Sequence, residues 1–304
     1  MSLSMMLTTA AMWVNARPIR LALTRDDYLE TLDPGRRPAE PPARLRRSGR
    51  VVVSRQDGLP VYRYEPATRT PGLELMYLPG GGLVNPLVTE HWWIVERLAR
   101  ATGAAITVVC YPLAPERGAD DTLTVIDAHY ERLAARAGTS RLLVAGDSAG
   151  GAVAVGLSLR AARRPDGLVL FSPWLDLALT NPAIARRVSR DPSLRVPGLR
   201  AGAEAWVGDR GLDDPALNPA RMGLAGLPPT LVFQGGRDIF FDDAVAFSRR
   251  ARAERASARL VTGGAGFHVY AGAFWTPEAR AAYALVGAFS CDPARVSHSG
   301  TYVQ

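Results

Sequence analysis

The sequence predicts an α/β fold, in which a mostly parallel sheet of eight strands is covered by helices on both faces. Two observations predict it: a series of short apolar runs typical of buried strands, and helix-like segments between most of them from the third run onward. The 304-residue chain is 47% hydrophobic, which is enough for a full core. We find no internal repeat, so a solenoid or a propeller is not expected.

The expected elements follow from apolar periodicity and from flanking turn residues. The expected strands cover residues 51–54, 60–64, 73–78, 105–111, 142–145, 168–171, 230–234 and 259–262. The expected helices cover residues 90–102, 121–137, 149–163, 242–256 and 277–288. Parallel strands need long crossover connections, and the helices provide them.

Two segments do not fit this alternation. Residues 1–48 comprise one or two amphipathic helices, expected within 1–33, and a proline-rich connector, PGRRPAEPPARLRRS. Residues 180–225 form a long insertion between the sixth and seventh strands. We expect both to form a helical cap on a core of residues 49–291, over the carboxyl ends of the strands, where open sheets bind ligands. The tail, 292–304, is expected to be loose at its end.

The charge pattern argues against nucleic-acid binding. The formal charge is +7 and every basic residue counted in it is arginine, but the arginines alternate with Asp, Glu and Ala, as in RRARAERASAR. A solvated basic surface is expected, because no basic stripe with interleaved aromatics is present. No run is long and apolar enough for a membrane span, and the N-terminal stretch is interpreted as part of the fold rather than as a signal peptide.

The two cysteines, Cys110 and Cys291, have neither metal-ligand spacing nor the pattern of a disulfide framework. We therefore expect a reduced, cytoplasmic protein. The sequence does not specify the oligomeric state and leaves a homodimer open.

The strongest local signal is GDSAG at residues 146–150, which follows an apolar run and precedes a helix of small residues. In a G-x-S-x-G pattern, small neighbours permit a tight strand-to-helix turn that exposes the serine hydroxyl. The start of the helix also directs amides and the positive end of its dipole at the reacting atom. Ser148 is therefore the candidate nucleophile. The alternative is a glycine-rich turn whose serine has no catalytic role.

A serine nucleophile needs a base, which itself needs an orienting acid, and after such an elbow the expected order is Ser, acid, His. Of the four histidines, only His268 follows the last strand within the part expected to be ordered, in GGAGFHVYAG. His91 and His129 fall on expected helices, where packing or surface roles are favoured. His298 lies in the tail.

The candidate acid is Asp238, which directly follows the strand LVFQGG. Asp242 and Asp243 compete with it, but they come where a helix should start and are typical of N-cap and first-turn positions. The candidate catalytic residues are therefore Ser148, Asp238 and His268.

Three consecutive glycines, in LPGGGLVNP, directly follow the third expected strand. Attack on an ester carbonyl builds negative charge on its oxygen, and each preorganised backbone donor contributes about 2.7–4 kcal/mol. The glycines allow main-chain amides to face the site where side chains would block the approach. The amide of Ala149, which follows the nucleophile, would complete such an oxyanion hole.

These motifs resemble the hormone-sensitive lipase-like group of α/β-hydrolases, whose signature is HGGG followed by GDSAG. YPLAPE at 111–116 is similar to the group's Y-R-L-A-P-E, and SPWLDL at 172–177 to its S-P-W-x-D-L. DPALNP and GLPPTLVFQGGRD, between 214 and 238, and GFHVY at the histidine also match. The matches keep their order from residue 76 to residue 270, about two thirds of the chain.

The resemblance implies an α/β-hydrolase fold with a helical cap and a serine esterase that uses neither a metal nor a cofactor. It also implies short to medium acyl esters as substrates. Carried over by position, the triad is Ser148, Asp238 and His268. The oxyanion hole consists of the amides of Gly81, Gly82 and Ala149.

Two positions depart from the group's pattern. Pro79 stands where the group has the histidine of HGGG, which is thought to anchor the loop by hydrogen bonds, and Pro112 replaces the arginine of Y-R-L-A-P-E. Proline fixes φ and removes one N–H donor, which suits a strand end. The departures could mark a subgroup with a different substrate.

The leading hypothesis is hydrolysis, through an acyl-enzyme, of a carboxylic ester or lactone of a small to medium apolar substrate. The first alternative is an acyltransferase or another tailoring enzyme of secondary metabolism, which would pass the acyl group to an alcohol or amine. The second is a non-catalytic small-molecule receptor, as in the plant gibberellin receptor, which has lost the catalytic histidine. Here all three triad positions are filled, which favours an enzyme.

Overall fold

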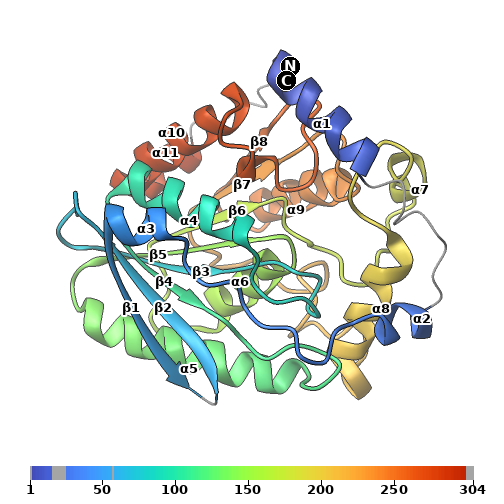
Figure 1. The fold of residues 1–304 in the computed structure, drawn as a ribbon, viewed down its shortest axis with the longest axis horizontal. Helices are drawn as coiled ribbons and strands as arrows, with labels where there is room; N and C mark the ends of the chain where they lie inside the picture. The colour runs from blue at the N-terminus through green and yellow to red at the C-terminus, as the bar shows by residue number, and fades with distance from the viewer. Residues whose placement is uncertain (1, 16–24, 57, 299–304) are drawn as a thin grey trace.

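The eight expected strands form one sheet in the computed structural model, in the order β1-β2-β4-β3-β5-β6-β7-β8 (Figure 1). The structure describes residues 2–15, 25–56 and 58–298. The strands are β1 (Gly49–Gln56), β2 (Leu59–Pro66), β3 (Leu73–Leu78), β4 (Ala105–Val109), β5 (Arg141–Asp147), β6 (Gly167–Phe171), β7 (Thr230–Gln234) and β8 (Ala258–Thr262). β2 pairs antiparallel with β1 and β4, and every other pair is parallel, which confirms the mostly parallel sheet.

Helices cover both faces of the sheet, as predicted. Because side chains alternate along a strand, Met76 and Leu78 of β3 join one apolar cluster while Leu75 and Tyr77 join the other. The first cluster contains residues of α5 (Ala119–Ala137), α6 (Ser148–Arg160) and α9 (Phe241–Ala253). The second contains residues of α4 (Thr89–Thr102) and α10 (Pro277–Cys291).

Three helix ends differ from the expectation by three residues. α9 ends at Ala253 instead of residue 256. α6 ends at Arg160 instead of residue 163, shortly before Pro165, and a residue that precedes proline disfavours the helical conformation. α10 continues to Cys291, and α11 (Pro293–His298) follows it. The tail thus begins with a helix, whose Pro293 and Ser297 are buried. Residues 299–304 lie outside the described part.

The N-terminal segment contains α1 (Leu3–Asn15) and α2 (Arg25–Glu30), and residues 16–24 lie outside the described part. A third helix, α3 (Ala43–Ser48), lies in the connector and buries Leu45. The insertion contains α7 (Ala183–Arg187), α8 (Val196–Val207) and the short 3₁₀ helix η2 (Gly208–Arg210). α2 packs against α8, whereas α1 lies beside α10 (Figure 1). The boundaries of the expected domains stay a prediction.

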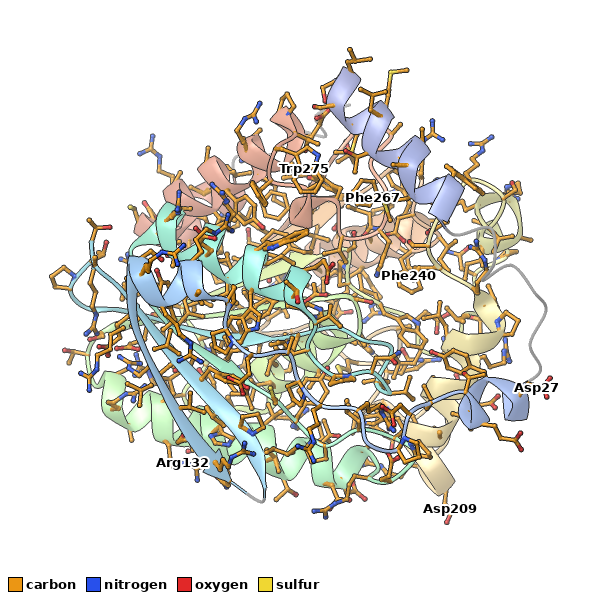
Figure 2. The ribbon with its side chains drawn as sticks, in the orientation of Figure 1. Asp27, Arg132, Asp209, Phe240, Phe267 and Trp275 are labelled. Carbon is orange, nitrogen blue, oxygen red and sulfur yellow. The ribbon has the colours of Figure 1, made fainter. Side chains whose placement is uncertain are left out.

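The parallel strands bring the candidate site residues to one edge of the sheet. The glycine loop follows β3, Ser148 follows β5, Asp238 follows β7 and His268 follows β8. Figure 2 shows Arg132 and Asp209 pointing away from the molecule, as a solvated charged surface requires. Within the described residues, no helix is both long and apolar enough to cross a membrane. Cys110 and Cys291 are free.

The contact between α6 and β3 generates a first prediction. A Cβ atom at Gly150 would lie 2.2 Å from the carbonyl oxygen of Leu78 and 2.6 Å from that of Pro79. Alanine is the better helix former by about 1 kcal/mol. We nevertheless expect Gly150→Ala to lower the free energy of unfolding by about 1–3 kcal/mol, because this overlap involves backbone that cannot rotate away.

Urea denaturation followed by circular dichroism measures this loss. Gly223→Ala is the matched control, because a Cβ atom there meets nothing within 4 Å and φ is not positive. Equal stability of the two variants would show that α6 can move away from β3 at little cost.

Candidate active site

Ser148 lies at the turn between β5 and α6 in a backbone conformation that few side chains adopt. Its φ is 51°, in the left-handed region, and its side chain faces a cavity at the carboxyl edge of the sheet. A Cβ atom at Gly146 would lie 2.6 Å from the carbonyl oxygen of Gly150. The two glycines of the GDSAG run are therefore sterically required by the turn that presents the Ser148 hydroxyl.

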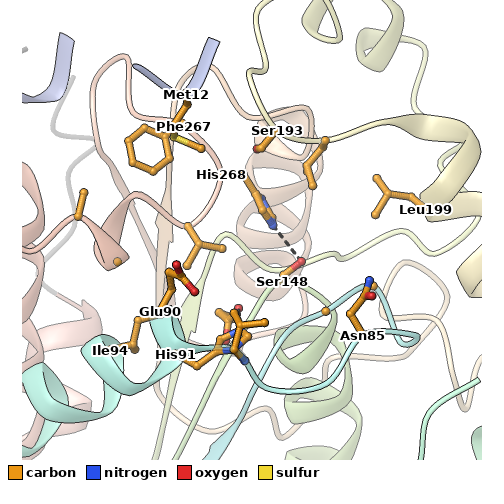
Figure 3. Close-up of a pocket in the computed structure, with 18 of the residues that line it drawn as sticks. Met12, Asn85, Glu90, His91, Ile94, Ser148, Ser193, Leu199, Phe267 and His268 are labelled. Atoms are coloured by element: carbon orange, nitrogen blue, oxygen red, sulfur yellow. Dashed lines mark hydrogen bonds and ion pairs between the residues drawn. The ribbon is translucent and has the colours of Figure 1, made fainter. Parts of the chain in front are cut away.

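His268 and Asp238 form a chain of hydrogen bonds with Ser148. Figure 3 shows the bond between His268 and Ser148. His268 Nε2 lies 2.9 Å from Ser148 Oγ, and His268 Nδ1 lies 2.8 Å from Asp238 Oδ2. A carboxylate can only accept, so Nδ1 carries the proton toward Asp238 and Nε2 accepts the Ser148 hydroxyl proton. The structure thus brings together the three residues that the sequence singled out.

Neighbouring groups fix the orientation of the three hydrogen-bonded side chains. The other oxygen of Asp238 accepts the amide of Phe240 at 2.9 Å, and Asp238 is completely buried. The Phe240 ring packs edge-on against the imidazole of His268, with 5.4 Å between ring centroids. The amide of Val269 donates to Ser172 Oγ at 2.9 Å, which fixes the backbone next to His268.

The competing acids and bases have other partners. Asp242 pairs with Arg187, and Asp243 accepts a hydrogen bond from Asn181. Burial, with neighbouring carboxylates, raises the pKa of Asp243 to about 6. His129 lies on α5 and His298 on α11, away from this edge of the sheet.

Opposing effects set the pKa of His268. Burial of the imidazole lowers it, but the charge and the hydrogen bond of Asp238, followed by the charges of Asp191 and Asp147, outweigh burial and raise the pKa above its usual 6.5. The site therefore favours a protonated His268 more strongly than water does.

The glycine loop between β3 and α4 faces Ser148 across the cavity. Gly81 and Gly82 have φ values of 132° and 64°, and both line the cavity. Within the described residues their amides have no recorded acceptor, whereas the amide of Gly80 donates to Asp147 Oδ1 at 3.0 Å. The amide of Ala149 lies in the first turn of α6, where no carbonyl of the same helix can accept it.

The loop is anchored although Pro79 replaces the expected histidine. The Tyr111 hydroxyl donates to the carbonyl oxygen of Pro79 at 2.5 Å, and Arg36 Nε donates to that of Val84 at 2.7 Å. The amide of Asn85 donates back to the Gly81 carbonyl at 2.8 Å. These bonds hold both ends of the loop, and Arg36 comes from the N-terminal connector.

Asp147, which directly precedes Ser148, is a further buried group that the sequence analysis did not single out. It accepts hydrogen bonds from the Tyr77 hydroxyl and the Gly80 amide, and its Oδ2 lies 3.4 Å from His91 Nε2. Burial raises the pKa of Asp147, but His91 and these hydrogen bonds outweigh it and lower the pKa below its usual range. His91, expected in a packing or surface role, thus lies beside the carboxylate of Asp147, the residue that precedes Ser148.

The cavity beside Ser148 has a volume of about 710 Å³ and a mostly apolar lining (Figure 3). Residues of α1, α4, the 193–199 segment and the loop after β8 form its walls. The apolar lining residues include Met12, Val88, Trp93, Ile94, Leu194, Leu199, Phe267, Val269 and Trp275. In the described part of the chain, no group of three or more His, Cys, Asp or Glu side chains could hold a metal ion.

The electrostatics of His268 give a second prediction. We expect its pKa in the wild type to lie above 6.5, and to fall in Asp238→Asn, because a lost negative charge no longer favours the imidazolium. NMR titration of the imidazole ring protons measures both values. Asp242→Asn, which removes a carboxylate paired with Arg187, is the matched control and should leave the His268 pKa unchanged.

Comparisons with known proteins agree with this arrangement. The sequence matches a protein family described as "alpha/beta hydrolase fold" over residues 75–272. It is 31% identical over 230 residues to an esterase of Acinetobacter venetianus, covering 71% of this chain and 74% of that protein. It is also 31% identical over 231 residues to an acetyl-hydrolase of Streptomyces hygroscopicus, covering 73% and 76%.

A solved esterase from the bacterial hormone-sensitive lipase family superposes with a TM-score of 0.77 at 26% identity, and the match covers 95% of this chain and 98% of that one. The order of the motifs, the sheet and these likenesses lead to the same assignment. The chain belongs to the α/β-hydrolase fold family and is similar, within it, to the hormone-sensitive lipase-like esterases.

Proposed function

We propose that this protein hydrolyses a carboxylic ester of an apolar substrate through an acyl-enzyme on Ser148, with His268 as the general base and Asp238 as the orienting acid. The chain is a carboxylesterase-type α/β-hydrolase, as its family and its relatives indicate. The observation that carries the finer proposal is the chain of hydrogen bonds from Ser148 Oγ through His268 to Asp238, at the wall of an apolar cavity.

In the first half of the reaction, His268 Nε2 takes the proton of Ser148 while Oγ forms a bond to the carbonyl carbon. The electron pair of the C=O double bond moves to oxygen, and the amides of Gly81, Gly82 and Ala149 stabilise this oxyanion. The tetrahedral intermediate then collapses, the bond to the alcohol oxygen breaks, and His268 returns the proton to the leaving alcohol. The products are a free alcohol and an acyl-Ser148.

In the second half, water replaces the alcohol. His268 takes a proton from the water molecule while the water oxygen attacks the acyl carbon, and the same amides stabilise the second oxyanion. Collapse breaks the bond to Ser148 Oγ, which regains its proton from His268, and the carboxylic acid leaves. A lactone follows the same steps, with the alcohol still joined to the acyl group.

The cavity supports an apolar substrate of small to medium size. About 710 Å³ is ample for such an ester, and the aromatic and aliphatic lining would gain free energy from each buried methylene. The expected cytoplasmic location stays a prediction, and the question of a homodimer stays open.

Ser148→Ala tests the assignment of the nucleophile. We expect kcat to fall by roughly 10⁴ to 10⁶, because the proposed triad acts as a unit. Intact-protein mass spectrometry after exposure to a fluorophosphonate should show a covalent adduct on the wild type and none on the variant. Ser158→Ala is the matched control, since Ser158 is a buried serine of the same helix and its hydroxyl donates to the Ala154 carbonyl. Turnover retained in Ser148→Ala would exclude this mechanism.

A chain-length series tests the substrate class. With p-nitrophenyl esters from acetate to octanoate, we expect kcat/KM to rise about threefold to fourfold per added methylene until the chain reaches a wall, at about 0.8 kcal/mol each. Met12→Trp should lower kcat/KM for octanoate more than for acetate, because Met12 lines the cavity. Met6→Trp, on the exposed side of the same helix, should change neither. A flat series would contradict an apolar acyl pocket.

A further inference from the structure

Asp191, between α7 and α8, is a completely buried carboxylate that joins the cavity wall to the loop of the proposed catalytic acid. Its Oδ1 accepts hydrogen bonds from the amide and hydroxyl of Ser193, at 2.8 and 2.9 Å, and from the amide of Leu194 at 2.9 Å. Its Oδ2 accepts the amide of Ile239, the residue after Asp238, at 3.1 Å. Ser193 and Leu194 line the cavity.

The contacts of Asp191 suit an ionised side chain. Three of the four partner groups are backbone amides, which can only donate, and the fourth is the Ser193 hydroxyl, which donates to Oδ1 when the carboxylate is ionised. Burial, followed by the charge of Asp238, raises the pKa of Asp191 above its usual value, although His268 and the amides of Leu194 and Ser193 act in the opposite direction and limit the rise.

The charged groups around Asp191 come from four segments. Asp238 belongs to the loop after β7, and His268 to the loop after β8. Arg195, on the same segment as Asp191, donates to the backbone carbonyl of Asp191 at 3.4 Å instead of to its carboxylate. Arg187 of α7 is paired with Asp242. Among the described residues, no ion pair neutralises the negative charge of Asp191, and this charge acts on His268.

We propose that Asp191 is a positioning residue for the proposed reaction, which fixes the Asp238 loop to the cavity wall and supplies a second negative charge that stabilises protonated His268. The inference rests on the proposed function, in which His268 gains a proton in each half-reaction. The hydrogen bond from Ile239 sets the position of the backbone next to Asp238, and the bonds from Ser193 and Leu194 set the wall that a substrate contacts. One side chain thus couples substrate position to acid position.

Asp191→Asn is the main test, because it keeps the size of the side chain and removes its charge. An asparagine can satisfy the donors on one oxygen only, and its NH₂ group would face the amide of Ile239. We expect kcat with p-nitrophenyl butyrate to fall by roughly tenfold to a hundredfold, as for other misplaced catalytic groups. We expect the acid limb of the kcat/KM pH profile to move to lower pH, because His268 loses a neighbouring negative charge.

Two further variants separate position from charge. Ser193→Ala removes one of the four hydrogen bonds and keeps the carboxylate, so kcat should fall while the acid limb stays at the wild-type pH. Asp213→Asn removes an equal charge from an exposed ion pair of the same insertion and should change neither kcat nor the pH profile. Should Asp191→Asn fail to fold, as judged by circular dichroism, the fall of kcat in Ser193→Ala decides the positional part.

The inference is overturned if the acid limb of the kcat/KM pH profile of folded Asp191→Asn lies at the wild-type pH. It is also overturned if Asp213→Asn shifts that limb as much as Asp191→Asn does. An unchanged kcat in Ser193→Ala overturns it as well. The fluorophosphonate adduct of the wild type distinguishes this failure from failure of the proposed function. A wild type that forms the adduct while Asp191→Asn behaves like Asp213→Asn refutes only the role of Asp191, whereas a wild type that forms no adduct refutes the proposed nucleophile.

Discussion

Close approach of backbone to backbone at the carboxyl ends of β3 and β5 is the constraint on which the rest of the site depends. α6 starts so near β3 that only glycine fits at position 150, and a Cβ atom at Gly80 would lie 2.5 Å from Asp147 Oδ2. The positive φ of Ser148 costs of order 1–3 kcal/mol, which the surrounding contacts must offset. One of them is the hydrogen bond of 2.9 Å from the amide of Trp174 to the Ser148 carbonyl. The hydroxyl and the glycine amides are thus fixed relative to one another without a substrate.

A second constraint is electrostatic, since one buried imidazole lies among three buried carboxylates. Asp147 is held in its charged form by His91 and by two hydrogen bonds, so it serves mainly to anchor the backbone around Ser148. Asp238 accepts a hydrogen bond from Nδ1 of His268. The charge of Asp191 also raises the pKa of this imidazole, without a hydrogen bond to it. Burial alone would disfavour the imidazolium form of His268. Each unit by which its pKa shifts corresponds to about 1.4 kcal/mol of difference between the two protonation states. The carboxylates reverse that preference, so the site stabilises the imidazolium form of His268.

The elements and the candidate triad were predictable because both have local signatures. Short apolar runs bounded by turn residues mark the strands, and GDSAG marks a tight strand-to-helix turn. Chain order then left His268 and Asp238 as base and acid, and the structure brings both to Ser148. The sheet order and the five parallel pairings could not be read from periodicity, which carries no information on which strands are neighbours.

The supporting residues were not predictable from local patterns. Asp191 lies in an irregular stretch of the insertion, and nothing in RDPSLRV distinguishes a buried carboxylate from an exposed one. Arg36 lies in a connector that looked like a spacer, yet its guanidinium bonds the Val84 carbonyl, 48 positions along the chain. α3, in the same connector, is too short for periodicity to reveal. Such contacts depend on tertiary packing, which a single sequence does not encode in any fixed spacing.

Contacts from distant segments also explain why a proline can stand at position 79, where the HGGG signature has a histidine. The loop is held through carbonyl oxygens, of Pro79 by Tyr111 and of Val84 by Arg36, and through the amide of Gly80. None of these hydrogen bonds needs an N–H at position 79, so the absence of this donor in proline costs the loop no hydrogen bond. The fixed φ of proline also reduces the freedom of the unfolded chain before three flexible glycines. The loop therefore keeps its shape because contacts from distant segments replace a side-chain anchor within the motif.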